Sequence, residues 1–213
     1  MIIQHIGHSC FKIQDKIGPD GLTLVTDPYD KKTGLKPPNF EANIITVSHS
    51  HDDHNNISAL RGKPIVIDTA GEYEIKGVAI QGIESYHDEK KGTERGLNII
   101  YRFEIDNISV VHLGDLGHVL DNKQLEALVG TDILMIPVGG KYTLNAKQAV
   151  EVISQIEPRL VIPMHYKVKG LKYDIDSIDK FIKEIGIKAT EEEKLKIAKK
   201  DLPQEDMELV VFN

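Results

Sequence analysis

Short runs rich in Ile and Val recur along the chain and predict β-strands. Gly, Pro, Asp and Asn bound these runs, as they commonly bound strands in folded proteins. Strands are therefore expected to make up much of the fold. The predicted strands cover residues 1–5, 10–14, 22–26, 44–47, 65–67, 78–83, 97–103, 108–111, 133–136, 160–162 and 209–212.

Three segments, 122–129, 145–156 and 175–185, instead carry apolar residues at helical spacing. In the second segment Asn145 and Gln148 resemble a capping box, which favours a helix start there. The faces expected to be buried are Leu125 with Leu128 or Val129, then Ala149, Val152, Ile153 and Ile156, and finally Ile178, Phe181, Ile182 and Ile185.

Residues 189–200 fit two structures. Their many charges suit a solvated helix, but Leu195 and Ile197 alternate with lysines, which favours an edge strand. Many strands come first and the longer helices come late, without a fixed-period repeat or a long linker. This order predicts one domain over residues 1–213, with sheets packed together and covered by helices, rather than a doubly wound parallel sheet.

Composition and charge narrow the class of protein. The formal net charge is −7, which argues against a nucleic acid as the main partner, because phosphate binding needs clustered Lys and Arg. The N-terminal residues lack a basic region and a long apolar region, so we expect neither a signal peptide nor a membrane span. The single cysteine, Cys10, suits a reducing cytoplasm and a small buried hydrophobe. We therefore expect a cytoplasmic protein that acts on a small molecule, either neutral or anionic, with homo-oligomerisation left open.

The densest chemical signal is the run His49-Ser50-His51-Asp52-Asp53-His54, directly after a predicted strand. Residues two apart in an extended chain point the same way, so His49 and His51 are placed to hold one metal ion. Asp53 and His54 lie past the bend and are placed to serve a second ion. Imidazole and carboxylate ligands suit Zn²⁺, and also Fe or Mn. The alternative is a solvated loop in which Asp53 merely caps a helix.

Acidic or histidine residues also follow other predicted strands. Asp27, His87, Asp115 and His165 each come directly after one. Taken singly, such residues are more often turn formers or ordinary hydrogen-bonding side chains. Their ordered recurrence favours ligands gathered from distant parts of the sequence at the ends of strands.

The order Asp27, His49-x-His51-x-Asp53-His54, His87, Asp115, His165 resembles the five ordered motifs of the metallo-β-lactamase superfamily. The finer pattern is similar to the branch of L-ascorbate-6-phosphate lactonase-like and uncharacterised Zn-dependent hydrolases. That pattern comprises Gly7-His8-Ser9, Leu113-Gly114-Asp115-Leu116-Gly117-His118 and Pro137-Val138-Gly139-Gly140. The resemblance implies an α/β fold in the form of a four-layer αβ/βα sandwich, with two divalent metal ions at one edge of the sheets.

The resemblance also assigns roles to residues. It implies His49, His51 and His87 as ligands of the first metal and Asp53, His54 and His165 as ligands of the second. Asp115 is implied as the carboxylate that bridges both metals, and Asp27 as an acid that orients a ligand. Zn²⁺ is expected first, with Mn²⁺ or Fe as alternatives.

A pair of metals lowers the pKa of a shared water towards ~7, so a metal-bridging hydroxide is the expected nucleophile. No Gly-x-Ser-x-Gly elbow or Cys–His pair competes with it. Asp53 and Asp115 are expected to support catalysis as well as to bind metal, and His8 or His118 is a candidate proton donor. For His112 a structural hydrogen bond is favoured. The Gly139–Thr143 loop with Lys141 is either an anion site or an ordinary turn before a helix.

The leading functional hypothesis is hydrolysis of a small ester, lactone or phosphodiester. The first alternative is an iron-dependent redox enzyme on the same scaffold, and the second is a non-catalytic metal-binding module. RNA processing is a weaker idea, because the charge balance is acidic and no RNA-binding insertion is recognisable.

Overall fold

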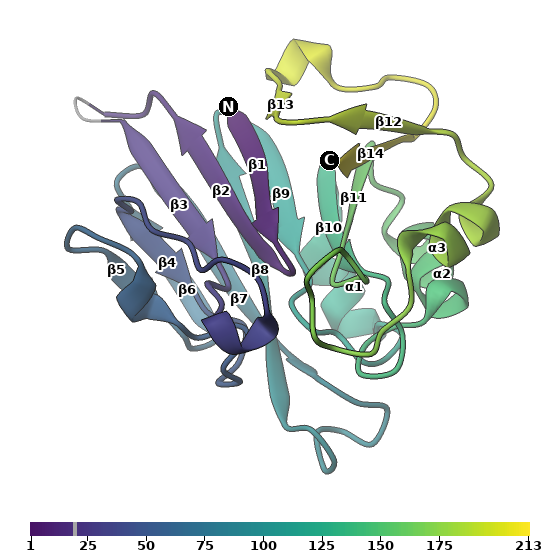
Figure 1. The fold of residues 1–213 in the computed structure, drawn as a ribbon. Coiled ribbons are helices and arrows are strands. Elements are labelled where there is room, and N and C mark those ends of the chain that lie inside the picture. The colour runs from purple at the N-terminus through teal and green to yellow at the C-terminus, as the bar shows by residue number, and fades with distance from the viewer. Residues whose placement is uncertain (19–20) are drawn as a thin grey trace.

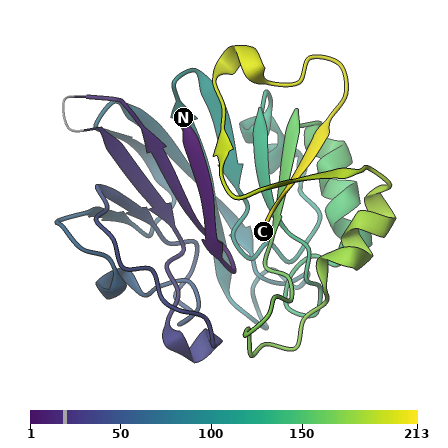
Figure 2. The ribbon, with the colours of Figure 1, turned by 45° about the horizontal axis from the view of Figure 1, so that its top comes forward.

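A computed structural model describes residues 1–18 and 21–213 and shows two β-sheets packed face to face (Figure 1; Figure 2). One sheet contains β1 (Ile2–Gly7), β2 (Cys10–Asp15), β3 (Leu22–Thr26), β4 (Ile44–Thr46), β5 (Ile65–Ile67) and β13 (Leu195–Lys196). The other contains β6 (Gly71–Ile75), β7 (Val78–Tyr86), β8 (Leu97–Ile105), β9 (Ile108–His112), β10 (Ile133–Pro137), β11 (Leu160–Met164), β12 (Ala189–Glu192) and β14 (Glu208–Phe212). Their strand orders are β13-β1-β2-β3-β4-β5 and β12-β14-β11-β10-β9-β8-β7-β6.

The main core lies between the two sheets. Because side chains alternate along a strand, Leu22 and Leu24 of β3 point into this core, whereas Val25 points to the other face. Tyr101 and Phe103 of the eight-stranded sheet fill the same layer and are fully buried. Each such side chain stabilises the fold by about 1.5–3 kcal/mol relative to an exposed position.

Three helices, α1 (Asn122–Leu128), α2 (Ala146–Ile156) and α3 (Ile178–Ile185), cover the outer face of the eight-stranded sheet (Figure 1). The predicted capping box of α2 is confirmed: the Asn145 side chain accepts from the backbone of Gln148, and Gln148 Oε1 accepts from Asn145 N. The predicted buried face of α2 is also confirmed. In the first helix Leu128 is buried and Val129 is 71% exposed, so Leu128 completes the apolar face.

Several element boundaries differ from the prediction by a few residues, and one strand was not predicted. Helix α3 begins at Ile178 rather than at 175, because Ser177 adopts an extended conformation as its N-cap, although Ile175 is still buried in the preceding loop. Strand β6 was not predicted, because two of its five residues are exposed glutamates. The strand alternative for residues 189–200 is confirmed, but as two short strands in different sheets, followed by the 3₁₀ helix η3 (Lys199–Asp201).

The sandwich expected from the sequence is confirmed, with one local difference. The outer face of the six-stranded sheet is covered by loops with two 3₁₀ helices, η1 (Lys31–Thr33) and η2 (Ile57–Ala59), rather than by long helices. Cys10 is buried in this layer, where burial raises the pKa of its thiol, as suits a structural side chain. Among the helices in the described part of the chain, none has the length and apolar character needed to span a bilayer.

Strand direction brings many chain segments to one edge of the sandwich. In the six-stranded sheet β3 and β4 are parallel, and β1 runs the same way because two antiparallel steps separate it from β3. In the other sheet β9, β10 and β11 are parallel, and β7 runs the same way for the same reason. The carboxyl ends of these strands therefore carry the loops that can build a common site.

Candidate metal centre

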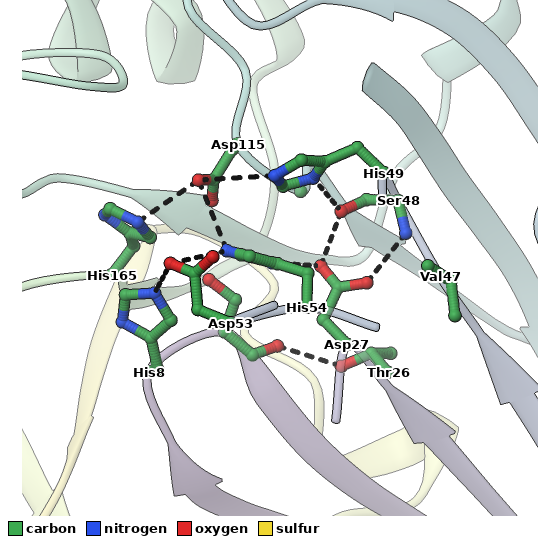
Figure 3. A network of polar contacts seen from close by, with 12 residues as sticks. His8, Thr26, Asp27, Val47, Ser48, His49, Asp53, His54, Asp115 and His165 are labelled. Atoms are coloured by element: carbon green, nitrogen blue, oxygen red, sulfur yellow. Dashed lines mark hydrogen bonds and ion pairs between the residues drawn. The ribbon is translucent and has the colours of Figure 1, made fainter. Parts of the chain in front are cut away.

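The histidines and carboxylates predicted from the sequence converge at this edge (Figure 3). Asp115, directly after β9, lies at their centre. Its Oδ2 atom is 3.2 Å from Nε2 of His87 and 3.2 Å from Nε2 of His165. The same oxygen is 3.3 Å from His54 Nε2 and 3.9 Å from His49 Nε2. Residues far apart in the sequence and on different sheets are thus in contact distance of one buried carboxylate.

The candidate ligands divide into two groups around Asp115. The first group is His49, His51 and His87, whose ring nitrogens lie within 4.8 Å of one another. The second group has four residues, whose ligand atoms also lie within 4.8 Å of one another. Asp115 links the two groups, because its carboxylate lies within the same distance of nitrogens of His49 and His54. The members of the second group are His8, Asp53, His54 and His165. This division is the one that the resemblance implies, with His8 added.

Buried polar atoms without partners test whether these residues fit divalent cations. His49 Nε2, His54 Nε2 and Asp115 Oδ1 are buried and make no hydrogen bond to any residue that the structure describes. Buried polar atoms are normally paired, since leaving one unpaired costs about 1–3 kcal/mol. These three atoms belong to imidazole and carboxylate groups whose ligand atoms lie within 4.8 Å of one another, and cation binding would satisfy them. The residues present therefore fit divalent metal ions.

Asp27 orients two of these ligands. It is fully buried after β3, and it accepts a hydrogen bond from the Ser48 backbone at 2.7 Å and from the Ser48 hydroxyl at 2.6 Å. His54 Nδ1 donates to the same carboxylate at 2.9 Å, which directs His54 Nε2 toward Asp115. Burial alone would raise the pKa of Asp27, but the hydrogen bond and charge of His54 hold it below the usual range. Ser48 extends the network to His49 Nδ1 at 2.9 Å.

Replacing Asp27 with Asn is expected to weaken metal binding by roughly 10- to 100-fold, the usual effect of removing a group that orients a ligand. The amide is close in size but cannot accept from Ser48 and His54 through two oxygens. Competition with a chromophoric chelator measures the affinity. Asp52→Asn is the matched control, because Asp52 lies beside the ligands but is exposed and paired with Lys32. Equal affinities for Asp27→Asn and the parent protein would contradict the role of Asp27.

Three residues of the site have left-handed backbone conformations, which are costly for side chains with a Cβ atom. The φ angles are 54° at His8, 39° at Asp27 and 52° at His165. Hydrogen bonds hold these turns: His165 N donates to His8 O at 3.1 Å, and Asp27 N donates to Thr46 O at 2.9 Å. These strained turns follow strands of both sheets, and each turn directs the chain after its strand toward the centre.

Two glycines allow backbone segments to approach this centre closely. A Cβ atom at Gly114, where φ is 57°, would lie 2.4 Å from Asn98 Oδ1. A Cβ atom at Gly117 would lie 2.4 Å from the carbonyl carbon of His87. Glycine is therefore required on both sides of Asp115, because the turn contacts other segments of the site at Gly114 and at Gly117.

His8 lies inside the site, next to Asp53. Its Nε2 atom is 3.1 Å from Asp53 Oδ2, and its ring centroid is 4.2 Å from that of His165. Burial, and then the charge of His165, lower the pKa of His8 to about 4, so the neutral ring donates to the carboxylate at neutral pH. This contact gives His8 a means of orienting Asp53, whereas its role as a proton donor stays a prediction.

His118 is engaged with the backbone instead. Its Nε2 atom accepts from Tyr86 N at 3.2 Å, and its Nδ1 atom donates to Val119 O at 2.8 Å. Both ring nitrogens are therefore occupied, which favours a structural role over proton donation. His112 makes the structural hydrogen bond expected of it, from Nε2 to Ser9 O at 2.8 Å.

Replacing His118 with Ala is therefore expected to destabilise the protein by about 0.5–1.5 kcal/mol, because the partly buried Tyr86 N–H loses its acceptor. The rate constant kcat should change little by comparison. Urea unfolding of the metal-loaded protein measures the first quantity, and steady-state kinetics of the same sample measures the second. A large fall in kcat with unchanged stability would instead identify His118 as a proton donor.

The loop before α2 does not present a free cation. Lys141 forms an ion pair with Asp174, and the Asn145 side chain accepts from two backbone N–H groups at the helix start. These contacts favour the ordinary turn over the anion site for the Gly139–Thr143 loop.

Sequence reasoning missed Asn98, a buried residue within β8. Its side-chain nitrogen donates to Ser85 Oγ at 2.7 Å and to Leu113 O at 2.9 Å, and its oxygen accepts from Asp115 N at 2.9 Å. Asn98 thereby fixes the backbone of the central carboxylate. A lone Asn in a strand pattern carries no signal that could have revealed this contact.

Comparisons with known proteins concern the family and the fold of the chain. Residues 2–165 match the β-lactamase superfamily domain family. The UPF0173 metal-dependent hydrolase MK1542 of Methanopyrus kandleri is 23% identical and covers 88% of this chain and 94% of its own. A Thermotoga maritima protein, assigned to the Zn-dependent hydrolases of the metallo-β-lactamase superfamily, is 36% identical with a TM-score of 0.79 and covers 99% of this chain and 97% of its own. A diiron β-hydroxylase from Streptomyces venezuelae shares the fold at 12% identity and a TM-score of 0.58, covering 87% of this chain and 51% of its own.

Proposed function

The chain belongs to the metallo-β-lactamase superfamily, among relatives named metal-dependent hydrolases, and from that premise we propose that it cleaves a small ester, lactone or phosphodiester. One observation carries the proposal. The Asp115 carboxylate lies between two groups of candidate ligands and within 3.9 Å of an imidazole nitrogen from each. A carboxylate in this position is suited to neutralise and hold apart two cations.

We assign His49, His51 and His87 to one divalent cation, Asp53, His54 and His165 to the other, and Asp115 to both. Two such cations supply a water of lowered pKa as nucleophile and a Lewis acid for the oxygen of the scissile bond. Zn²⁺ is the first candidate, with Mn²⁺ or Fe as alternatives, because imidazole and carboxylate donors suit all three.

Neighbouring side chains hold the candidate ligands in place, and most of these ligands are buried. Asp27 and Ser48 fix the rings of His54 and His49, and His8 holds Asp53. His51 is exposed, whereas His54, His87 and His165 are buried, so substrate has access to the centre from the His51 side. Such pre-arranged groups lower the reorganisation that the reaction requires.

Hydrolysis is favoured over the redox alternative by the relatives whose similarity covers most of both chains. The likeness to the diiron hydroxylase concerns the fold alone. The non-catalytic alternative is opposed by the complete set of candidate ligands. We also propose a cytoplasmic location, which is supported by the single buried cysteine.

Metal analysis joined to a hydrolysis assay tests the proposal. The protein is purified, its metal content is determined, and it is assayed on a panel of lactones, esters, phosphodiesters and thioesters with Zn²⁺ or Mn²⁺ supplied. Turnover that depends on metal and disappears in His51→Ala is the expected result. No turnover of any class by fully loaded protein would overturn the proposal, and iron with characteristic absorption bands would favour the redox alternative.

A further inference from the structure

The loop of residues 88–96 connects a candidate ligand, His87, to strand β8, and a buried carboxylate fixes its backbone. Asp88 is 4% exposed. Burial opposes its ionisation, but backbone N–H donors, with Arg95 first among them, lower its pKa. The four donors are Lys90 N at 2.8 Å, Gly92 N at 2.9 Å, Glu94 N at 3.0 Å and Arg95 N at 2.8 Å.

The two ends of this loop are also tied together. His87 N donates to Gly96 O at 3.1 Å, and Gly96 N donates to Gly92 O at 2.9 Å. The loop therefore has one backbone arrangement next to the candidate metal centre. A side chain that it carries near Gly96 is held at a fixed distance from His87.

Most charged groups of the loop already have partners. Lys90 forms an ion pair with Glu94, and Glu89 accepts from the Gln148 side chain. Arg95 differs, because its guanidinium has no acidic partner among residues 1–18 and 21–213. Arg95 is half-buried, and its Cζ atom lies 5.5 Å from the ring centroid of Tyr142. A stacked, partly desolvated guanidinium without a carboxylate is poised to bind an external anion.

Arg95 also lines a cavity that reaches the candidate ligands. The cavity has a volume of about 510 Å³ and is lined by His49 and His51 as well as by Arg95 and Leu97. Two carboxylates, Asp68 and Glu84, line it too, but both are exposed and therefore well solvated. A ligand that displaces water from the cavity therefore interacts more strongly with the half-buried Arg95 guanidinium than with these solvated carboxylates.

We propose that Arg95, stacked on Tyr142 and held by the Asp88 loop, binds an oxyanion group of the substrate, either a carboxylate or a phosphate, beside the metal centre. The inference rests on the proposed function and narrows it to substrates that carry a negative charge in addition to the bond that is cleaved. The guanidinium offers two parallel N–H donors to two oxygens of that group. Substrate is thereby oriented with its scissile bond toward His49 and His51.

Binding of inorganic phosphate to the Zn²⁺-loaded protein, measured by calorimetric titration, tests the site without turnover. Arg95→Gln is expected to raise the dissociation constant by about tenfold or more, because a charge-assisted bidentate contact is lost. Lys91→Gln is the matched control, since Lys91 is an exposed cation of the same loop without an ion-pair partner in the described chain. Arg95→Lys should recover part of the affinity. Unchanged affinity in Arg95→Gln, no measurable phosphate binding by the parent protein, or equal losses in Arg95→Gln and Arg95→Lys would each overturn the proposal.

A kinetic comparison separates this proposal from the proposed function. Mono-4-nitrophenyl succinate carries a carboxylate, whereas 4-nitrophenyl acetate is neutral, and the 4-nitrophenyl carboxylic ester of phosphoglycolic acid supplies a phosphate separate from the scissile bond. Arg95→Gln should raise KM for the anionic substrates and leave KM for the neutral ester unchanged. If none of the three is hydrolysed, the proposed hydrolysis fails for these esters, while the phosphate titration still decides the role of Arg95.

Discussion

Replacing Asp115 with Asn is expected to lower kcat/KM by roughly a thousandfold or more, because it removes the carboxylate charge that the two proposed metal ions would share, and with those ions the source of the nucleophile. The Asp115 carboxylate is buried and faces four imidazoles. Burial opposes its ionisation, but His165 and His54 hold the pKa of the Asp115 carboxyl well below its usual range. An amide in its place keeps the size but is neutral. Metal content should fall together with activity.

Metal analysis and kinetics on one preparation check this expectation. Asp121→Asn is the matched control, because Asp121 caps α1 a few residues further on and Asn is an equally good N-cap. That variant should keep both metal and rate. An Asp115→Asn protein that retained two metals and more than about a tenth of the parental kcat/KM would contradict the central position of Asp115.

Removing metal with a chelator is expected to lower the melting temperature by roughly 8–16 °C, taking about 4 kcal/mol for a ligand present at a thousand times its dissociation constant and about 2–4 °C per kcal/mol for a domain of this size. The physical reason is that the candidate ligands come from both sheets. His49, Asp53 and His54 follow strand β4, whereas His87, Asp115 and His165 follow strands of the other sheet.

Thermal unfolding with chelator, and again after Zn²⁺ is returned in excess, gives the measurement. The Asp115→Asn protein serves as the control, since its melting temperature should hardly respond to either treatment. Identical melting curves for the parent protein with and without metal would show that the residues do not bind a cation in the folded state.

Much of the fold could be predicted because its strands are short apolar runs with clear boundaries. β3 and β5 were predicted with the bounds that the structure has, and the capping box of α2 marked the start of that helix. The convergence of Asp27, His49, Asp115 and His165 follows from a simple regularity. Each lies within three residues of the end of a strand, and these strands run in one direction within their sheets.

The rest depends on contacts that local sequence does not encode. The hydrogen bond of Asn98 to Asp115 and the stacking of Arg95 on Tyr142 join residues that are distant along the chain, without a periodic pattern. The engagement of both nitrogens of His118 depends on where the Tyr86 backbone lies. Strand β6 satisfies its backbone by pairing with β7, so its glutamates do not need to follow an apolar pattern.

The placement of candidate ligands on both sheets has a consequence for biosynthesis. His165 follows β11, and its backbone N–H binds the carbonyl of His8 near the opposite end of the polypeptide. A nascent polypeptide on the ribosome thus lacks the second of the two candidate ligand groups until residue 165 has emerged and docked. The second candidate ligand group is therefore completed late in maturation, whereas the first group, His49, His51 and His87, is already present in a product that ends before β11.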